Sequence, residues 1–83
     1  MSYEPKMTVC NVQGFNGHAR RTGVKSVVDM TGASIVCLQE TKLAIVTHSI
    51  LMETLGADFD AYFCLPAVDT RGGIIVAWVS RVV

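Results

Sequence analysis

The segment Ser34-Ile35-Val36-Cys37-Leu38-Gln39-Glu40-Thr41-Lys42 decides how this chain folds. Residues 35–38 form an apolar run without alternation, which is typical of a strand covered on both faces. Glu40 then falls where the strand leaves the core. A carboxylate at such a point stays ionised and hydrated while the sheet holds its backbone, which suits a hard cation such as Mg²⁺. The segment therefore predicts a strand that carries an acid to the rim of a sheet.

A second short apolar run lies upstream of that strand. Met7-Thr8-Val9-Cys10-Asn11-Val12-Gln13-Gly14-Phe15 predicts another short strand, which ends in an amide and a glycine turn. The residues between the two runs, 18–31, predict a helix with Asn16 as its N-cap and Gly32 as a left-handed stop. Its buried face is expected to consist of the residues at i, i+3, i+4 and i+7 spacing, which are Val24, Val27, Val28 and Thr31.

Asn11 and Glu40 are expected to meet at one rim of the sheet. A helix of about 14 residues rises roughly 20 Å, close to the span of six strand residues, so the strands that it joins are predicted to be parallel. Parallel strands place their carboxyl ends at the same edge. An amide that orients a phosphoryl oxygen beside an acid that holds a metal is the beginning of a phosphate-ester site. Without this neighbour, Glu40 would simply be a solvated acid.

Further segments complete an α/β domain. They are a short helix over 48–55, a strand over 60–65, a loop over 66–72 and a strand over 73–79. Thr47 is the expected N-cap of the short helix, and Gly56 is expected to end it. We expect residues 1–6 to form an N-terminal tail and residues 7–83 to form the domain.

Three segments stand in an order and spacing that resembles a known family. They are Asn11-Val12-Gln13-Gly14-Phe15, the run from Ser34 to Lys42, and Arg71-Gly72-Gly73-Ile74-Ile75-Val76-Ala77-Trp78. Together they look like the opening of the endonuclease/exonuclease/phosphatase superfamily, and the likeness is strongest to the endonuclease domains of plant LINE-type retrotransposons. The resemblance covers the chain from about Met7 to Val83. Its most specific part is Gln-Glu-Thr-Lys, residues 39–42.

The resemblance implies a fold, an activity and two site residues. The fold would be the amino-terminal portion of a four-layer α/β/β/α sandwich of the DNase-like type. The activity would be Mg²⁺-dependent hydrolysis of phosphodiesters in DNA, with Asn11 as the catalytic first-strand Asn and Glu40 as the catalytic, metal-binding Glu. The sequence departs from the plant elements at Cys10, where they usually carry Trp, and at Gln13, where they usually carry Arg. The lost Arg removes a cation that would attract phosphate.

Other residues that the family needs have no counterpart in this sequence. Family members use a Tyr, an Asp-x-Asn pair and a late Asp-His pair, all of which follow the first third of such a domain. His18 and His48 fall at predicted helix ends and are expected to be ordinary exposed histidines. We therefore expect an amino-terminal fragment that is inactive alone and binds Mg²⁺ in the millimolar range or more weakly.

Composition excludes several classes of protein. A hydrophobic content of 51% excludes a disordered tail, and seven basic and seven acidic residues give no net charge. A nucleic-acid binder usually carries a basic patch, and the one basic cluster of the sequence, Arg20, Arg21 and Lys25, is expected on the solvated face of a helix. No signal core or membrane-length run is present, so we expect no membrane association and a cytosolic or nuclear protein. Cys10, Cys37 and Cys64 lack partners at zinc spacing and are expected to act as small hydrophobic residues.

Three functional hypotheses remain open on the sequence alone. The first is the amino-terminal part of a Mg²⁺-dependent DNA endonuclease of retrotransposon type. The second is a phosphatase of the same superfamily, acting on a small or lipid phosphate ester. The third is a degenerate remnant or interaction module without activity. Because the apolar strands would lack one covering layer and expose an edge, we also expect self-association through the strand edges.

Overall fold

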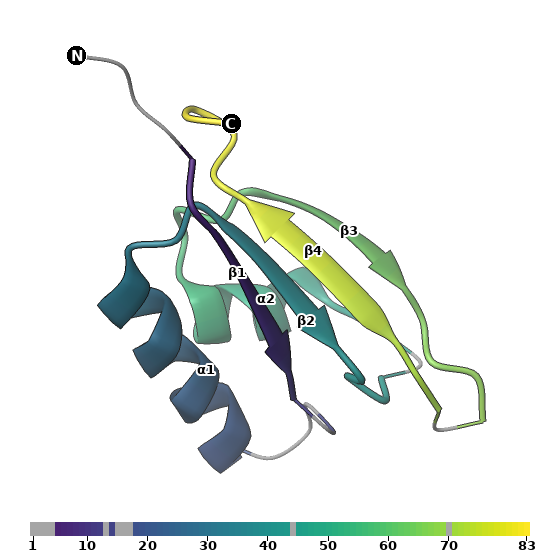
Figure 1. Ribbon diagram of the computed structural model, residues 1–83. Coiled ribbons are helices and arrows are strands. Elements are labelled where there is room, and N and C mark those ends of the chain that lie inside the picture. Colours follow the sequence, from purple (N-terminus) through teal and green to yellow (C-terminus); the bar gives the residue numbers. More distant parts are fainter. Residues whose placement is uncertain (1–4, 13, 15–17, 44, 70) are drawn as a thin grey trace.

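The chain forms a small α/β domain with a four-stranded mixed sheet and two helices (Figure 1). A computed structural model describes residues 5–12, 14, 18–43, 45–69 and 71–83. In chain order its elements are β1 (Met7–Asn11), α1 (His18–Thr31), β2 (Ile35–Gln39), α2 (His48–Leu55), β3 (Ala61–Leu65) and β4 (Ile74–Trp78). The strands stand in the order β1-β2-β4-β3 across the sheet.

The predicted parallel pair is confirmed. β1 and β2 run in the same direction, with Met7 opposite Ile35 and Asn11 opposite Gln39. β4 lies antiparallel to β2 on its other side, and β3 continues the sheet antiparallel to β4. β2 is therefore an inner strand with a ladder of hydrogen bonds along both edges. The β1-α1-β2 unit supplies the parallel pair of the mixed sheet.

Helix α1 occupies the predicted range, but its buried face is narrower than predicted. Gly32 ends it with φ 65°, and the amide of Gly32 donates to the carbonyl of Val28 at 3.1 Å. Val24 and Val28 are buried, whereas Val27 is 40% exposed and Thr31 is exposed. Val27 lines an open cavity of about 350 Å³ beside the end of β1, because β1 is an edge strand and leaves that side of the helix uncovered. The predicted cap Asn16 lies outside the described residues.

Helix α2 begins and ends as predicted. The hydroxyl of Thr47 accepts a hydrogen bond from the amide of Ile50 at 3.3 Å, and Gly56 follows the last turn with φ 92°. Leu51 and Leu55 are buried between this helix and the sheet. Both helices thus contribute to one core on one face of the sheet, together with Val36, Leu38, Ile75 and Ala77. No helix among the described residues is long and apolar enough to cross a membrane.

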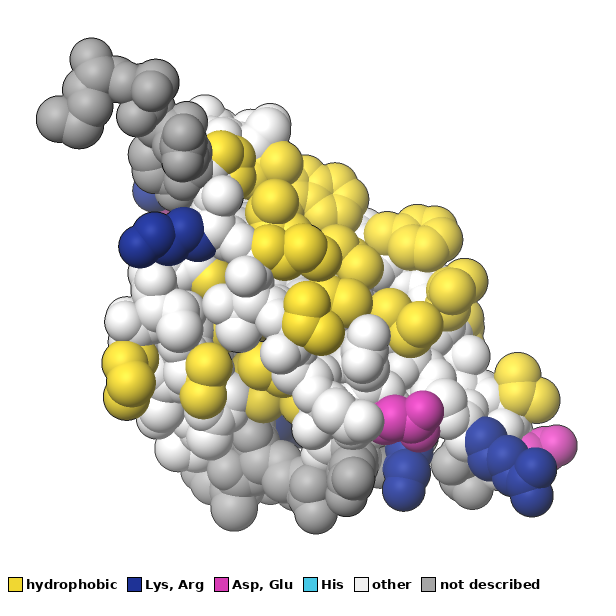
Figure 2. Space-filling view, viewed as in Figure 1, with side chains coloured by type: hydrophobic (Ala, Val, Ile, Leu, Met, Phe, Trp, Pro, Cys, Tyr) yellow, Lys and Arg dark blue, Asp and Glu magenta, His cyan; other side chains and the backbone are white. Residues whose placement is uncertain are grey.

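The other face of the sheet is open, which corrects the prediction that strand 35–38 is covered on both faces. Val36 and Leu38 have no exposed surface, whereas Ile35 and Cys37, which point the other way, are only half-buried. The apolar run without alternation arises because one set of side chains faces the helices and the other set faces this open, equally apolar surface. Figure 2 shows hydrophobic side chains gathered across it.

Lys6 and the segment after β4 are held at the end of the sheet where β1 and β2 begin. The amide of Lys6, which the sequence places in the tail, donates to the Ser34 hydroxyl at 3.2 Å, and its carbonyl accepts from the amides of Ser34 and Ile35. After β4, the Asp60 carboxylate accepts hydrogen bonds from the backbone amide of Ser80 at 2.9 Å and from the Ser80 hydroxyl. The Arg81 Nη1 atom lies 3.4 Å from the Asp58 Oδ1 atom.

The Asp60 carboxylate should make stability depend on pH. The hydrogen bonds from the hydroxyl and then the amide of Ser80 lower the pKa of Asp60 below its ordinary value of 3.8. Because the folded pKa is the lower one, this contribution is present above pH 3.8 and is lost as pH falls through the folded pKa. We expect the urea midpoint of Asp60→Asn to lie below that of the unchanged chain at pH 7, and the gap to narrow at acid pH. An equal gap at both pH values would contradict this.

Candidate functional site

Three segments meet at one end of the sheet, where β1 and β2 end and β4 begins. We call this end the rim and define it by residues 11, 12, 14, 39–42 and 71–73. It includes residues from each of the three segments that carry the family resemblance. They are far apart in the sequence, so only the folding of the sheet brings them together (Figure 1).

Backbone hydrogen bonds join the three segments directly. From the β1 side, the amide of Val12 donates to the carbonyl of Gln39 at 2.9 Å, and the amide of Gly14 donates to the carbonyl of Glu40 at 2.7 Å. From the other side, Thr41 and Lys42 receive partners in the glycine pair: their amides donate to the carbonyls of Gly73 at 3.1 Å and Gly72 at 2.8 Å. The segment 39–42 is therefore held on both sides beyond the formal end of β2.

Gly73 is required by its close approach to Thr41. It has φ 91°, a conformation that side chains disfavour, and a Cβ atom at this position would collide with the Thr41 hydroxyl oxygen. Thr41 is itself 1% exposed, and the Thr41 hydroxyl lies 3.5 Å from the amide of Leu43, which donates to it. Gly73, in the Arg71-Gly72-Gly73 segment, thus has a structural role, which is to let the chain before β4 pass close to the turn that carries Glu40.

Glu40 and Lys42 adopt unusual backbone conformations. Both have φ 58°, in the left-handed region that L-residues other than Asn, Asp and Gly rarely enter. Such a conformation costs on the order of 1 kcal/mol for each residue and occurs often at functional sites. Here the hydrogen bonds to Gly14 and Gly72 hold the chain in it. The two exposed side chains, one acidic and one basic, consequently project from a fixed turn into solvent.

Asn11 lies at the same rim, as predicted from the parallel pairing. It pairs with Gln39, the residue before Glu40, and both amides are exposed. By strand alternation Asn11 and Gln39 lie on the open face of the sheet, while Glu40 follows beyond the strand end. The structure therefore brings the backbones of Asn11 and Glu40 to neighbouring positions; the catalytic roles given to them remain predictions.

The rim offers a cation one carboxylate rather than a prepared cage. Among the residues that the structure describes, no group of three His, Cys, Asp or Glu side chains is placed to hold a metal ion. Glu40 is exposed and hydrated, so its carboxylate fits a Mg²⁺ ion that keeps most of its water ligands. The exposed Lys42 and Arg71 place positive charge at the same end of the sheet.

The remaining acids and histidines lie elsewhere or serve other contacts. Asp58 and Asp60 are at the opposite end of the sheet, where they contact Arg81 and Ser80. Asp69 is at the same end of the sheet as the rim, in the loop between β3 and β4, but is not one of the residues that define the rim. His48 is exposed at the start of α2. The side chain of His18 lies outside the described part of the chain.

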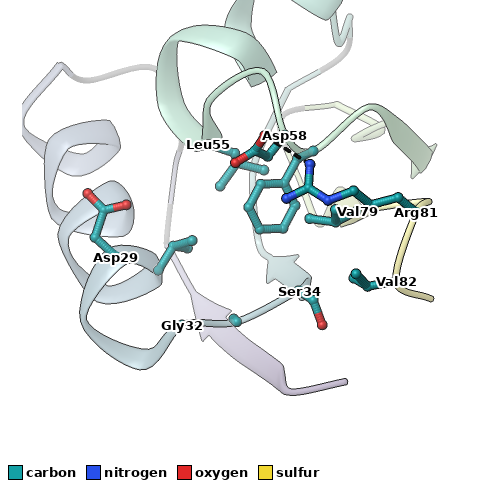
Figure 3. A pocket seen from close by; sticks show the side chains of 11 residues that line it. Asp29, Gly32, Ser34, Leu55, Asp58, Val79, Arg81 and Val82 are labelled. Atoms are coloured by element: carbon teal, nitrogen blue, oxygen red, sulfur yellow. Dashed lines mark hydrogen bonds and ion pairs between the residues drawn. The ribbon is translucent and has the colours of Figure 1, made fainter. Parts of the chain in front are cut away.

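A cavity of about 360 Å³ lies at that opposite end, between the end of α1, the start of β2 and the last turn of the chain (Figure 3). Its polar groups already serve structural contacts. Arg81 reaches Asp58, Asp29 lies 3.6 Å from Lys25, and Ser34 accepts a hydrogen bond from the amide of Lys6. This cavity is therefore a weaker candidate for a reactive site than the rim.

The cysteines behave as small, partly buried side chains. All three are free thiols, and each lies on a strand. Burial, followed by the proximity of Cys37, raises the pKa of Cys10, so this thiol stays protonated at neutral pH and is a poor nucleophile. Cys10 and Cys64 face the helices, whereas Cys37 lies on the open face of the sheet, as the pairing register requires.

Comparisons with known proteins leave the family resemblance untested. A scan against models of protein families found no match for this chain, and a search of curated protein sequences found none either. The resemblance rests on the three sequence segments alone.

The rim also contains a residue that sequence reasoning missed, Thr41. Thr41 is buried because β4 passes beside it. It follows the end of β2 at Gln39, so the alternation of buried and exposed residues along the strand does not predict its burial. The sequence signal for this contact is the Gly72-Gly73 pair before β4, because a glycine near a strand often marks the close approach of another backbone.

Two glycine substitutions test the close packing at the rim. We expect Gly73→Ala to lower the free energy of unfolding by about 2 kcal/mol or more, because the new methyl group meets Thr41 in a left-handed conformation. Gly23→Ala is the matched control in α1, where nothing lies within 4 Å of the new Cβ. It should stabilise the helix by about 0.5–1 kcal/mol. Equal effects in urea unfolding would show that the rim is not packed in this way.

Proposed function

We propose that this domain carries the metal-binding rim of a Mg²⁺-dependent phosphodiester hydrolase of the endonuclease/exonuclease/phosphatase type, with DNA as the substrate. The observation that supports the proposal most directly is the β1-β2 register, which sets Asn11 beside the residue that precedes Glu40. The second support is the left-handed turn at Glu40 and Lys42, which is fixed by both neighbouring segments.

Each rim residue has a distinct role in this proposal. Glu40 would hold Mg²⁺, which when bound supplies positive charge that stabilises a phosphoryl group as it gains negative charge. The amide of Asn11 donates a hydrogen bond to a phosphoryl oxygen and fixes its orientation. Lys42 and Arg71, both exposed at the rim, attract the phosphates on either side of the scissile bond. Thr41 and Gly73 do not touch the substrate and serve to hold the turn.

The four-layer sandwich belongs to the same proposal. The domain supplies one helical layer and one sheet, and the sheet's open face is apolar in the way that a face covered by a second sheet would be. Such a partner sheet would complete the α/β/β/α order. The Asp-x-Asn and Asp-His pairs that the family uses for attack and proton transfer are not among these 83 residues. We therefore assign metal and phosphate binding to this domain and no turnover to the domain alone.

Two alternatives use other features of the same structure. A phosphatase of this superfamily would use the same rim on a small or lipid phosphate ester, and substrate preference would distinguish it from a DNA endonuclease. A non-enzymatic interaction module is favoured by the large apolar face of the sheet, which is independent of the rim. The first alternative retains the role of Glu40, and the second does not.

Binding of Mg²⁺ at the rim can be observed without any enzymatic activity. We expect a Mg²⁺ titration to shift the backbone amide resonances of residues 39–42 and 11–12, with saturation in the millimolar range because one carboxylate is available. Glu40→Gln should abolish these shifts. Glu53→Gln, a matched change on the exposed surface of α2, should leave them unchanged. Shifts centred elsewhere, or micromolar binding, would refute this assignment.

Cleavage by the isolated domain is the second test. We expect no nicking of supercoiled plasmid above background in the presence of Mg²⁺, because the groups that would move the proton are missing from this sequence. Glu40→Ala should behave like the unchanged chain in this assay. Nicking that disappears in Glu40→Ala would show instead that the domain is a complete catalyst.

A further inference from the structure

The open face of the sheet has a simple composition that follows from the pairing register. Its side chains form three rows across the four strands: Met7, Ile35, Trp78 and Ala61; Val9, Cys37, Val76 and Phe63; and Asn11, Gln39, Ile74 and Leu65. No charged residue occurs in any row. Two rows are wholly apolar, and the third carries its two amides at the corner next to the rim.

This face exposes more apolar surface than isolated side chains would. Phe63 is 58% exposed, Met7 57%, Val9 55% and Leu65 52%. With the half-buried residues between them, the face presents on the order of 600 Å² of apolar surface, at the upper end for the largest patch on a monomeric protein. Figure 2 shows this surface as a continuous band of hydrophobic side chains.

We propose that this face binds a second copy of the same chain, sheet against sheet. Two such faces would bury roughly 1200 Å² in total, which reaches the lower limit of stable, specific protein interfaces. A two-fold interface brings each patch against its own copy, so a charged patch would repel itself. The three rows carry no charge and meet this condition without further adjustment.

The proposed dimer has a defined geometry. Sheets that pack face to face lie about 10 Å apart, with their strands within about 30° of each other. The middle row, with Cys37 and Val76 on the two inner strands, would occupy the centre of the interface. The helices of both copies would lie outside, and Asn11 and Gln39 would keep their water at the border. The dimer would cover the same face that a second sheet covers in the proposed sandwich, while Glu40 lies beyond the rows and Asn11 stands at their border.

The face is a better surface for association than the strand edges. Both edge strands, β1 and β3, contain five residues, so pairing along either edge would form a short ladder. It would also leave the apolar rows in contact with water. Covering the face removes this surface in both copies, and the hydrophobic effect is proportional to the apolar area removed.

Trp78 provides a reporter of the interface. It is the only tryptophan of the chain, it is half-buried, and it lies in the first row on the open face. We expect sedimentation equilibrium to show a monomer–dimer transition in the micromolar range, and the Trp78 emission to shift to shorter wavelength over the same concentrations. A chain that stays monomeric throughout, or a dimer that forms without a shift of Trp78, would overturn the proposal.

Charged substitutions distinguish the face from other surfaces. We expect Phe63→Lys on β3 and Val9→Lys on β1 each to weaken dimerisation at least tenfold, because each buries a lysine in both copies of the apolar interface. Met30→Lys is the matched control, since Met30 is 84% exposed on α1, on the far side of the sheet. Circular dichroism should show that all three variants remain folded.

The two face variants keep the test decisive even if one of them fails to fold. Dimerisation that survives in the folded face variant would overturn the proposal and point to pairing along the edges. An equal loss in Met30→Lys would also overturn it, because that change does not touch the face. Loss in the face variants with retention in Met30→Lys would support it.

Discussion

The ladder of hydrogen bonds along both sides of β2 is the constraint on which the rest of the domain depends. β2 pairs in parallel with β1 and antiparallel with β4, so it fixes the direction of both neighbours, and β3 follows from its pairing with β4. The same strand supplies Val36 and Leu38, which are fully buried against the helices. Without this inner strand neither the core nor the rim would exist, because the segments of the rim are joined to one another through residues 39–42.

One face of the sheet is covered by helices and the other is exposed, although the side chains on both faces are largely apolar. On one face, α1 and α2 cover the inner strands with Val24, Val28, Leu51 and Leu55. On the other face nothing in the described chain covers the rows from β1 to β3. Burying this exposed apolar layer would add stability. The proposed sandwich and the proposed dimer would each bury it. Both are ways to remove the same surface from water.

The rim illustrates how backbone strain and packing are combined at one place. Glu40 and Lys42 hold left-handed conformations, and Gly73 supplies the space in which Thr41 is buried. The carbonyls and amides of the turn bond to the neighbouring segments, and Thr41 packs against Gly73, so the exposed side chains of Glu40 and Lys42 are not needed to hold it. An acid and a base are therefore presented to solvent from a rigid position, which is the arrangement that binding of a metal or a phosphate requires.

The sequence by itself determined the local elements, the helix of residues 18–31 and the Thr47 and Gly56 caps, since short-range patterns specify them. The length of that helix also predicted the parallel pair that sets Asn11 near Glu40, because a connection of this length brings the chain back to the same end of the sheet. Only the tertiary structure decided which apolar residues are covered. Periodicity identifies a face but not its neighbour, so Val27 and strand 35–38 were predicted to be more buried than they are. The burial of Thr41 and the need for Gly73 likewise arise from contact between segments distant in sequence, which no local pattern records.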